Sequence, residues 1–70
     1  MMTIDGTYGM TIDRVPGWAS EASAIAIAQR TARMCGIEVT LTERAADWQA
    51  VRFIGQASPR GWVRYEGARA

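Results

Sequence analysis

The sequence contains no histidine, no lysine and no asparagine, and Cys35 is its single cysteine. A single cysteine excludes a disulfide within the chain, and a structural zinc site needs histidines or further thiolates that this chain does not have. Histidine is also the side chain that most often serves enzymes as a general acid or base. These absences predict a protein without a bound metal, without a cofactor and without catalytic residues.

The remaining reactive side chains do not form a catalytic pattern. Cys35 falls near the end of a predicted helix, on its apolar side, so we expect it to be a small core residue. The seven carboxylates are scattered over turns and strands, and no pair has a spacing that brings both into one pocket. The glycines do not form a phosphate-binding motif. The sequence therefore predicts that the protein is not an enzyme.

Long hydrophobic runs are missing too. The longest apolar stretch, residues 24–28, is far shorter than the about 20 residues that a membrane-spanning helix needs. No basic segment followed by an apolar run is found near the amino terminus, so no secretory signal is expected. Together with the unpaired cysteine, this predicts a cytoplasmic protein that does not bind a membrane.

The charges that are present are nearly balanced. The net charge is +1 at pH 7, so long-range attraction to nucleic acid is weak. All eight cations are arginines, which reflects either a coding sequence that favours arginine and alanine or a need for the planar guanidinium in bidentate and stacked contacts. The composition, 49% hydrophobic and 21% charged over 70 residues, is typical of one globular domain that covers residues 1–70.

The middle of the sequence has the pattern of one helix, starting at residue 18 or 20 and ending at 34. Ser20 is a typical N-cap, Glu21 favours the positive end of the helix dipole, and Gly36 is a typical helix stop. Arg30 and Arg33 fall on the polar side. The predicted apolar stripe comprises Ala24, Ile27, Ala28, Thr31, Met34 and Cys35, with Ile25 and Ala32 at its border.

Alternation of apolar and polar residues predicts strands on both sides of this helix. Asp5-Gly6 is a typical two-residue hairpin turn and pairs residues 1–4 with the segment that starts at Thr7. Residues 37–43, 48–54 and 62–66 alternate as strands do, the last two being joined by a loop, 55–61, with a turn at 58–61. We expect the tail, 67–70, to be frayed. The sequence predicts an α+β domain in which a single helix packs on one face of a four- to five-stranded antiparallel sheet, with the order ββαβββ.

The functional prediction depends on which face of this sheet stays open. We expect the helix to cover Ile37, Val39, Leu41, Val51, Phe53, Val63 and Tyr65. The open face then carries Glu38, Thr40, Trp48, Arg52, Ile54, Trp62, Arg64 and Glu66. Matching the two alternations across residues 44–47 requires an odd loop or a bulge. In this register Arg52 faces Arg64, and Glu38 on the neighbouring strand relieves their repulsion.

Tryptophan and arginine on an open face form a candidate partner-binding site, because these residue types are enriched at binding hot spots. The predicted site comprises Trp48, Arg52, Trp62 and Arg64, extended by Arg60 in the turn, with Arg30 and Arg33 as a secondary surface on the helix. The alternative is a face without a partner, on which Glu38 and Glu66 neutralise the arginines and the indole rings shield apolar surface.

In length, in its single domain and in its lack of catalytic groups, the whole chain resembles the small phage-encoded inhibitors, anti-CRISPR proteins among them, which share no common motif. The resemblance implies a bacterial or phage protein that docks on a large effector, such as a CRISPR effector complex, and blocks nucleic-acid recruitment or target cleavage. The alternative is a small nucleic-acid-binding regulatory protein whose aromatic side chains stack on bases while its arginines hold phosphates. A homodimer formed through the tryptophan face or the edge strands is a third alternative.

Overall fold

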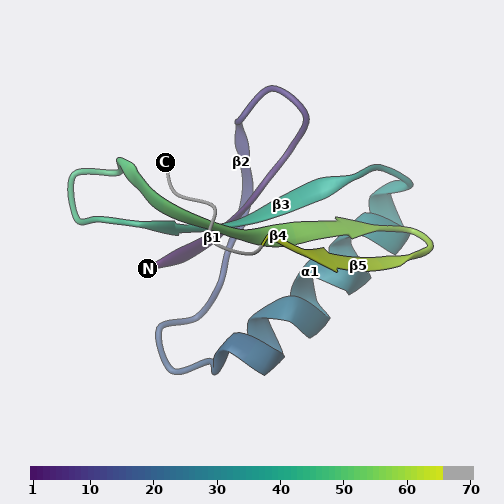
Figure 1. The fold of residues 1–70 in the computed structure, drawn as a ribbon, viewed down its shortest axis with the longest axis horizontal. Coiled ribbons are helices and arrows are strands. Elements are labelled where there is room, and N and C mark those ends of the chain that lie inside the picture. Colours follow the sequence, from purple (N-terminus) through teal and green to yellow (C-terminus); the bar gives the residue numbers. More distant parts are fainter. Residues whose placement is uncertain (66–70) are drawn as a thin grey trace.

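The computed structural model describes residues 1–65, and it has the predicted α+β fold with the element order ββαβββ (Figure 1). The elements are β1 (Met2–Asp5), β2 (Thr11–Arg14), α1 (Glu21–Cys35), β3 (Val39–Arg44), β4 (Ala50–Ser58) and β5 (Gly61–Arg64). The strands form one antiparallel sheet in the order β2-β1-β3-β4-β5, and α1 packs on one face of it. Glu66 and the predicted frayed tail, 67–70, lie outside the described residues.

The helix begins and ends where its local signals predict. The amide of Ser23 donates to the hydroxyl oxygen of Ser20 at 3.1 Å, and Gly36 ends the helix with a φ of 67°. The buried row consists of Ala24, Ala28 and Ala32. Alanine at every fourth position lets the helix approach the sheet closely, because no long side chain separates the two layers. The helix α1 is neither long nor apolar enough to cross a membrane.

Two predicted members of the buried helix stripe are wrong. Met34 is 79% exposed, and Cys35 is exposed as well. At about 100° per residue, Met34 points about 120° away from Ala28, the centre of the buried row. Cys35 lies in the last turn, past Ala32, where the buried row ends. Cys35 is therefore a surface thiol and not a core residue.

The β1–β2 hairpin exists, but the predicted two-residue turn at Asp5-Gly6 is wrong. Asp5 still belongs to β1, and the chain reverses over Thr7, Tyr8 and Gly9. The amide of Gly6 donates to the carbonyl of Met10 at 2.8 Å, and the amide of Gly9 donates to the carbonyl of Gly6 at 3.0 Å. Gly9 carries the positive φ, 77°, that such a three-residue loop requires at its last position.

An odd loop or a bulge was expected across residues 44–47, and the pairing of β3 with β4 contains two irregularities, at the Glu43–Arg44 and Leu41–Thr42 steps. They change which side chains of β4 and β5 face the helix. The pairing steps from Leu41–Gly55 to Thr42–Phe53, so Ile54 is an extra residue in β4. Ile54 is buried under the helix, whereas Val51 and Val63 are 52% and 64% exposed. The predicted assignment of the two faces is therefore wrong for β4 and β5. The buried apolar core comprises Ile4, Val15, Ala24, Ala28, Ala32, Val39, Leu41, Ile54 and Ala57.

The segment predicted as a loop, 55–61, mostly continues the sheet. β4 extends to Ser58, and only Pro59 and Arg60 separate it from β5. Gly55 pairs with Arg64, and the ring of Trp62 lies over Gly55 on the helix side. Gly55 leaves room for that ring within the strand, so here the glycine marks close packing and not the predicted loop.

Candidate binding face

The arginines of the predicted binding site lie on the helix side of the sheet. Arg64 forms an ion pair with Glu21 at 2.6 Å. Arg52 lies 3.1 Å from Glu43 and 3.9 Å from Glu21. Glu21 in the first turn of α1 pairs with Arg64, and Glu43 of β3 is the closer partner of Arg52, so both arginines are neutralised at the surface on the helix side. These guanidinium groups do not belong to the open face.

The expected interactions of these arginines also change. Glu38 does not contact them but accepts a hydrogen bond from the side chain of Gln56. Arg52 and Arg64 do not face each other, since the residue paired with Arg64 is Gly55. The electrostatic repulsion predicted between the two arginines is therefore absent from the pairing.

The structure separates the two tryptophans of the predicted site. Trp62 is half-buried and packs against the core beneath the helix. Trp48 is not in a strand but in the β3–β4 loop, with a positive φ of 73°. The guanidinium carbon of Arg14 lies 4.7 Å from the centre of the Trp48 ring, and that of Arg44 lies 5.6 Å away. Trp48 is thus already held between two cations of its own chain.

The other predicted arginines are exposed and dispersed. Arg60 lies in the β4–β5 turn, where its amide donates to the hydroxyl of Ser58. Arg30 and Arg33 lie on α1, and Arg30 lines a groove that also contains Met34 and Cys35. The structure therefore does not bring the predicted site residues together on one surface.

The face opposite the helix is a different surface, built by cross-strand pairing. Residues paired directly across an antiparallel sheet point to the same face. One row of such pairs crosses all five strands on the open face, and it comprises Thr11, Asp5, Thr40, Gln56 and Val63. A second row runs from Arg14 through Thr3 and Thr42 to Phe53. Polar and small residues thus dominate the centre of this face.

A buried ion pair organises one half of the open face. Arg44 donates to Asp5 at 2.8 Å, and the exposed fractions of the two side chains are 12% and 5%. Arg44 also donates to the hydroxyl of Thr3 at 3.0 Å and to the carbonyl of Trp48 at 2.8 Å. The hydroxyl of Thr11 donates to the second carboxylate oxygen of Asp5 at 3.1 Å. Both charges are therefore paired and further satisfied by neutral groups, as buried charges need to be.

Sequence reasoning assigned both members of this pair to turns. The signal that could have found them is alternation. In β1, Asp5 falls two residues after Thr3, so both point to the same face of the sheet. In β3, Arg44 follows Thr40 and Thr42 at the same two-residue spacing and points to the same face as they do. Because β1 and β3 are adjacent in the sheet, the two side chains meet on one face.

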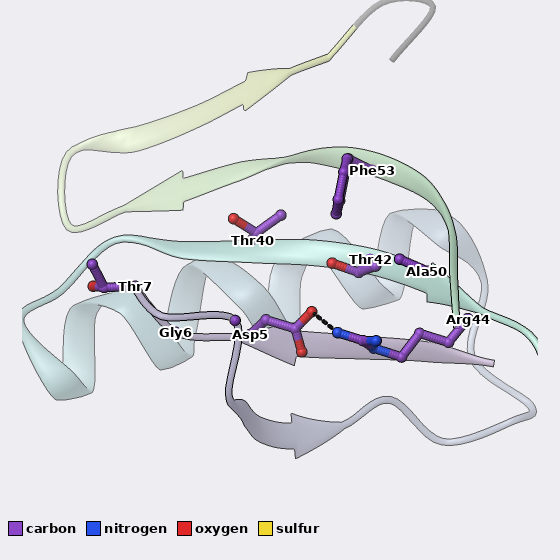
Figure 2. Close-up of a pocket in the computed structure, with 9 residues that line it drawn as sticks. Asp5, Gly6, Thr7, Thr40, Thr42, Arg44, Ala50 and Phe53 are labelled. Carbon is purple, nitrogen blue, oxygen red and sulfur yellow. Dashed lines mark hydrogen bonds and ion pairs between the residues drawn. The ribbon is translucent and has the colours of Figure 1, made fainter. Parts of the chain in front are cut away.

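Beside the ion pair lies an open pocket of about 320 Å³. Figure 2 shows Asp5 and Arg44 pointing toward each other, while Phe53 points toward Thr42 from the neighbouring strand. The pocket is lined by Asp5, Gly6, Thr7, Gly9, Thr40, Thr42, Arg44, Ala50 and Phe53. The hydroxyl oxygen of Thr42 is buried and has no hydrogen-bond partner within the described part of the chain, residues 1–65. The pocket therefore combines a neutralised ion pair, hydroxyl groups and one aromatic side chain.

Apolar side chains surround this pocket. Tyr8, at the tip of the β1–β2 loop between two pocket-lining residues, is 92% exposed. Val63 is exposed on β5, and the hydroxyl of Tyr65 donates to Gln56 of the open-face row. With Phe53, these residues place aromatic and apolar side chains on the strands and the loop that carry the polar pocket. We call Tyr8, Phe53, Val63, Tyr65 and the pocket the open-face site.

Comparison of the chain with known protein families, with curated proteins and with solved structures finds no match. In residues 1–65, no three histidine, cysteine, aspartate or glutamate side chains are close enough together to hold a metal ion. The geometry of the open-face site is therefore the basis on which a function can be argued.

Proposed function

We propose that the protein is a small non-enzymatic protein-binding module that docks on its partner through the open-face site. The observation that carries the proposal is the exposure of two side chains near a polar pocket: Tyr8 lies in the loop whose neighbours line the pocket, and Val63 lies on the sheet face that the helix leaves free. Aromatic residues are enriched in protein interfaces, and exposed apolar surface next to pockets marks contact sites. This surface replaces the tryptophan and arginine surface expected from the sequence.

The charge distribution favours a protein partner over a nucleic acid. Phosphate binding needs free cations, and each phosphate contact releases counterions. Arg52 and Arg64 are paired with glutamates, and Arg44 is paired with Asp5. The open-face site is therefore nearly neutral, which suits an apolar and hydrogen-bonding interface. The alternative of a nucleic-acid-binding regulatory protein has less support on the sheet, because Arg52 and Arg64, the two cations expected there, are paired with glutamates.

The resemblance to small phage-encoded inhibitors gives the proposal a specific partner class. In this form of the proposal, the module docks on a large nucleic-acid-processing effector of bacteria, such as a CRISPR effector complex, and blocks it. The open-face site is the surface that we expect to contact the effector.

The test is a binding measurement with surface variants. The tagged protein is used to isolate a partner from bacterial lysate, and the dissociation constant for the purified partner is measured for wild type, Tyr8→Ala and Val63→Asp. Loss of a hot-spot residue weakens binding by about 2 kcal/mol, so we expect each variant to bind about 30-fold more weakly. Trp18→Ala is the matched control, because Trp18 is also exposed but lies in the β2–α1 connection.

Circular dichroism shows whether each variant is folded. Wild-type affinity in both folded open-face variants, or equal losses in the Trp18 control, would contradict the proposed docking surface. Binding of nucleic acid that declines steeply with salt would favour the alternative function instead.

A further inference from the structure

Thr42 carries a buried hydroxyl that has no partner among residues 1–65. The side chain is fully buried, its oxygen has no hydrogen bond to any of these residues, and the residue lines the open-face pocket. Buried hydroxyl groups in proteins are nearly always hydrogen-bonded, because an unpaired one loses its interactions with water without replacement. A hydroxyl of this kind in a pocket wall can take its partner from a ligand.

The neighbouring ion pair supplies both kinds of hydrogen-bonding group. Each carboxylate oxygen of Asp5 accepts one recorded hydrogen bond, and a carboxylate has about four acceptor positions in all. Arg44 uses three of its five N–H groups, on Thr3, Trp48 and Asp5. A donor and an acceptor, 2.8 Å apart, therefore both have capacity left beside the pocket.

The net charge of these groups selects against charged ligands. Asp5 and Arg44 neutralise each other, so a ligand carboxylate or ammonium would lose its water without gaining an uncompensated counter-charge. The pocket volume of about 320 Å³ and the glycines at positions 6 and 9 leave room for a compact group. Phe53 adds a flat apolar wall. These features fit a neutral, planar group that both donates and accepts hydrogen bonds.

We infer that the pocket binds a primary carboxamide, the side-chain end of an asparagine or glutamine that the protein partner inserts. This inference rests on the proposed function, since the partner supplies the side chain. The carboxamide oxygen accepts from the guanidinium or from Thr42, its two N–H groups donate to the carboxylate, and its plane lies against Phe53. A hydroxyl ligand presents a single donor and lacks the flat surface that the ring contacts.

The inference is tested without the partner, by nuclear magnetic resonance titration of the labelled full-length protein. The probes are N-acetyl-asparagine methylamide and N-acetyl-aspartate methylamide. They differ only in the end of the side chain, which is a carboxamide in the first and a carboxylate in the second. We expect the carboxamide to shift the backbone amide signals of Thr40, Thr42 and Arg44 at millimolar concentration. The carboxylate probe should need at least about a tenfold higher concentration for the same shift, which is the equivalent of one lost charge-assisted hydrogen bond.

Thr42→Val separates the ligand contact from folding. Valine has nearly the same shape as threonine, and it removes a hydroxyl that has no partner among residues 1–65. We expect this variant to unfold at the same or a higher urea concentration and to bind the carboxamide about tenfold more weakly. The matched control is Thr31→Val, because the hydroxyl of Thr31 bonds to the carbonyl of Ile27 within the helix. The control should bind the carboxamide like wild type.

Equal binding of the two probes, or full affinity for the carboxamide in Thr42→Val, would overturn the inference. These outcomes are independent of the proposed docking surface. If the Tyr8 and Val63 variants lose affinity for the partner but the carboxamide probe does not bind the pocket, the proposed function stands and the inference is wrong. If the carboxamide probe binds but the Tyr8 and Val63 variants keep full affinity for the partner, the pocket inference stands and the proposed docking surface is wrong.

Discussion

Asp5 lies on the open face of the sheet, yet its side chain is almost completely buried. Arg44 and the β1–β2 hairpin contribute to this burial, since Arg44 contacts the carboxylate and Thr11 donates to it. The same side chains that form the pocket wall are therefore part of the folded framework. The ion pair in the pocket wall is held by buried groups, which keeps the geometry of this pair fixed before a partner arrives.

The buried ion pair gives a prediction at the scale of one residue. Asp5→Asn keeps the shape of the side chain but leaves the charge of Arg44 without its partner, and breaking a buried pair costs about 3–5 kcal/mol. We expect the urea midpoint of unfolding to fall strongly. The control is Glu21→Gln, because Glu21 meets Arg64 and Arg52 at the solvent-exposed surface, where ion pairs contribute about 0–1 kcal/mol. Equal effects of the two changes would contradict the structural role given to Asp5.

At the scale of elements, the parts of the fold governed by local signals were predictable. Ser20 and Gly36 determine the ends of α1, and both act at their predicted positions. The alternation in 37–43 and 48–54 correctly predicts two paired strands. Element order and sheet type then follow, because an apolar helix stripe and half-apolar strands bury each other most simply in two layers.

The faces of β4 and β5 were not predictable in the same way. Two residues of β4 are extra in the pairing, Val51 opposite the Glu43–Arg44 step and Ile54 opposite the Leu41–Thr42 step, and nothing in their neighbours marks a bulge. One extra residue exchanges the two faces of a strand, so Val63 becomes exposed and Trp62 faces the helix. For this reason the open face does not carry the predicted tryptophan and arginine side chains, and the candidate site lies around Asp5, Thr42 and Phe53 instead.

The β4–β5 hairpin is fitted to the helix through one glycine. A Cβ atom on Gly55 would lie 2.4 Å from the Trp62 ring and 2.6 Å from the carbonyl oxygen of Val63. The backbone oxygen cannot move without breaking the strand pairing, so Gly55→Ala should destabilise the protein by about 1–3 kcal/mol, the usual range for overpacking. Trp62 fluorescence during urea unfolding measures the change.

Gly17→Ala is the matched control for Gly55. A Cβ atom at position 17 meets no other atom within 4 Å, and the residue has no positive φ. An alanine there reduces the conformational freedom of the unfolded chain, so the stability of the Gly17→Ala variant should equal that of wild type or exceed it by about 0.4–1 kcal/mol. If alanine is tolerated equally at both positions, then Trp62 does not occupy the space above Gly55.

At the scale of the whole molecule, the helix supports the sheet unevenly. α1 packs mainly on β3, β4 and β5, whereas β2 lies at the far edge of the sheet. β3 is the central strand and is paired on both sides. The two halves of the open-face site therefore differ in support, because Phe53 and Val63 lie over the helix-backed strands and Tyr8 lies in the β1–β2 loop.

This asymmetry predicts the order of amide hydrogen exchange. The β3 amides should exchange only through global unfolding, while β2 amides and that of Val15, which donates to Met2 at 2.9 Å, should exchange at least about tenfold faster through local opening. If the partner docks on the open-face site, it contacts the β1–β2 loop and closes this local opening. Saturating partner should then slow exchange in β2 more than in β3. Equal protection of β2 and β3 in the free protein would contradict the predicted local opening.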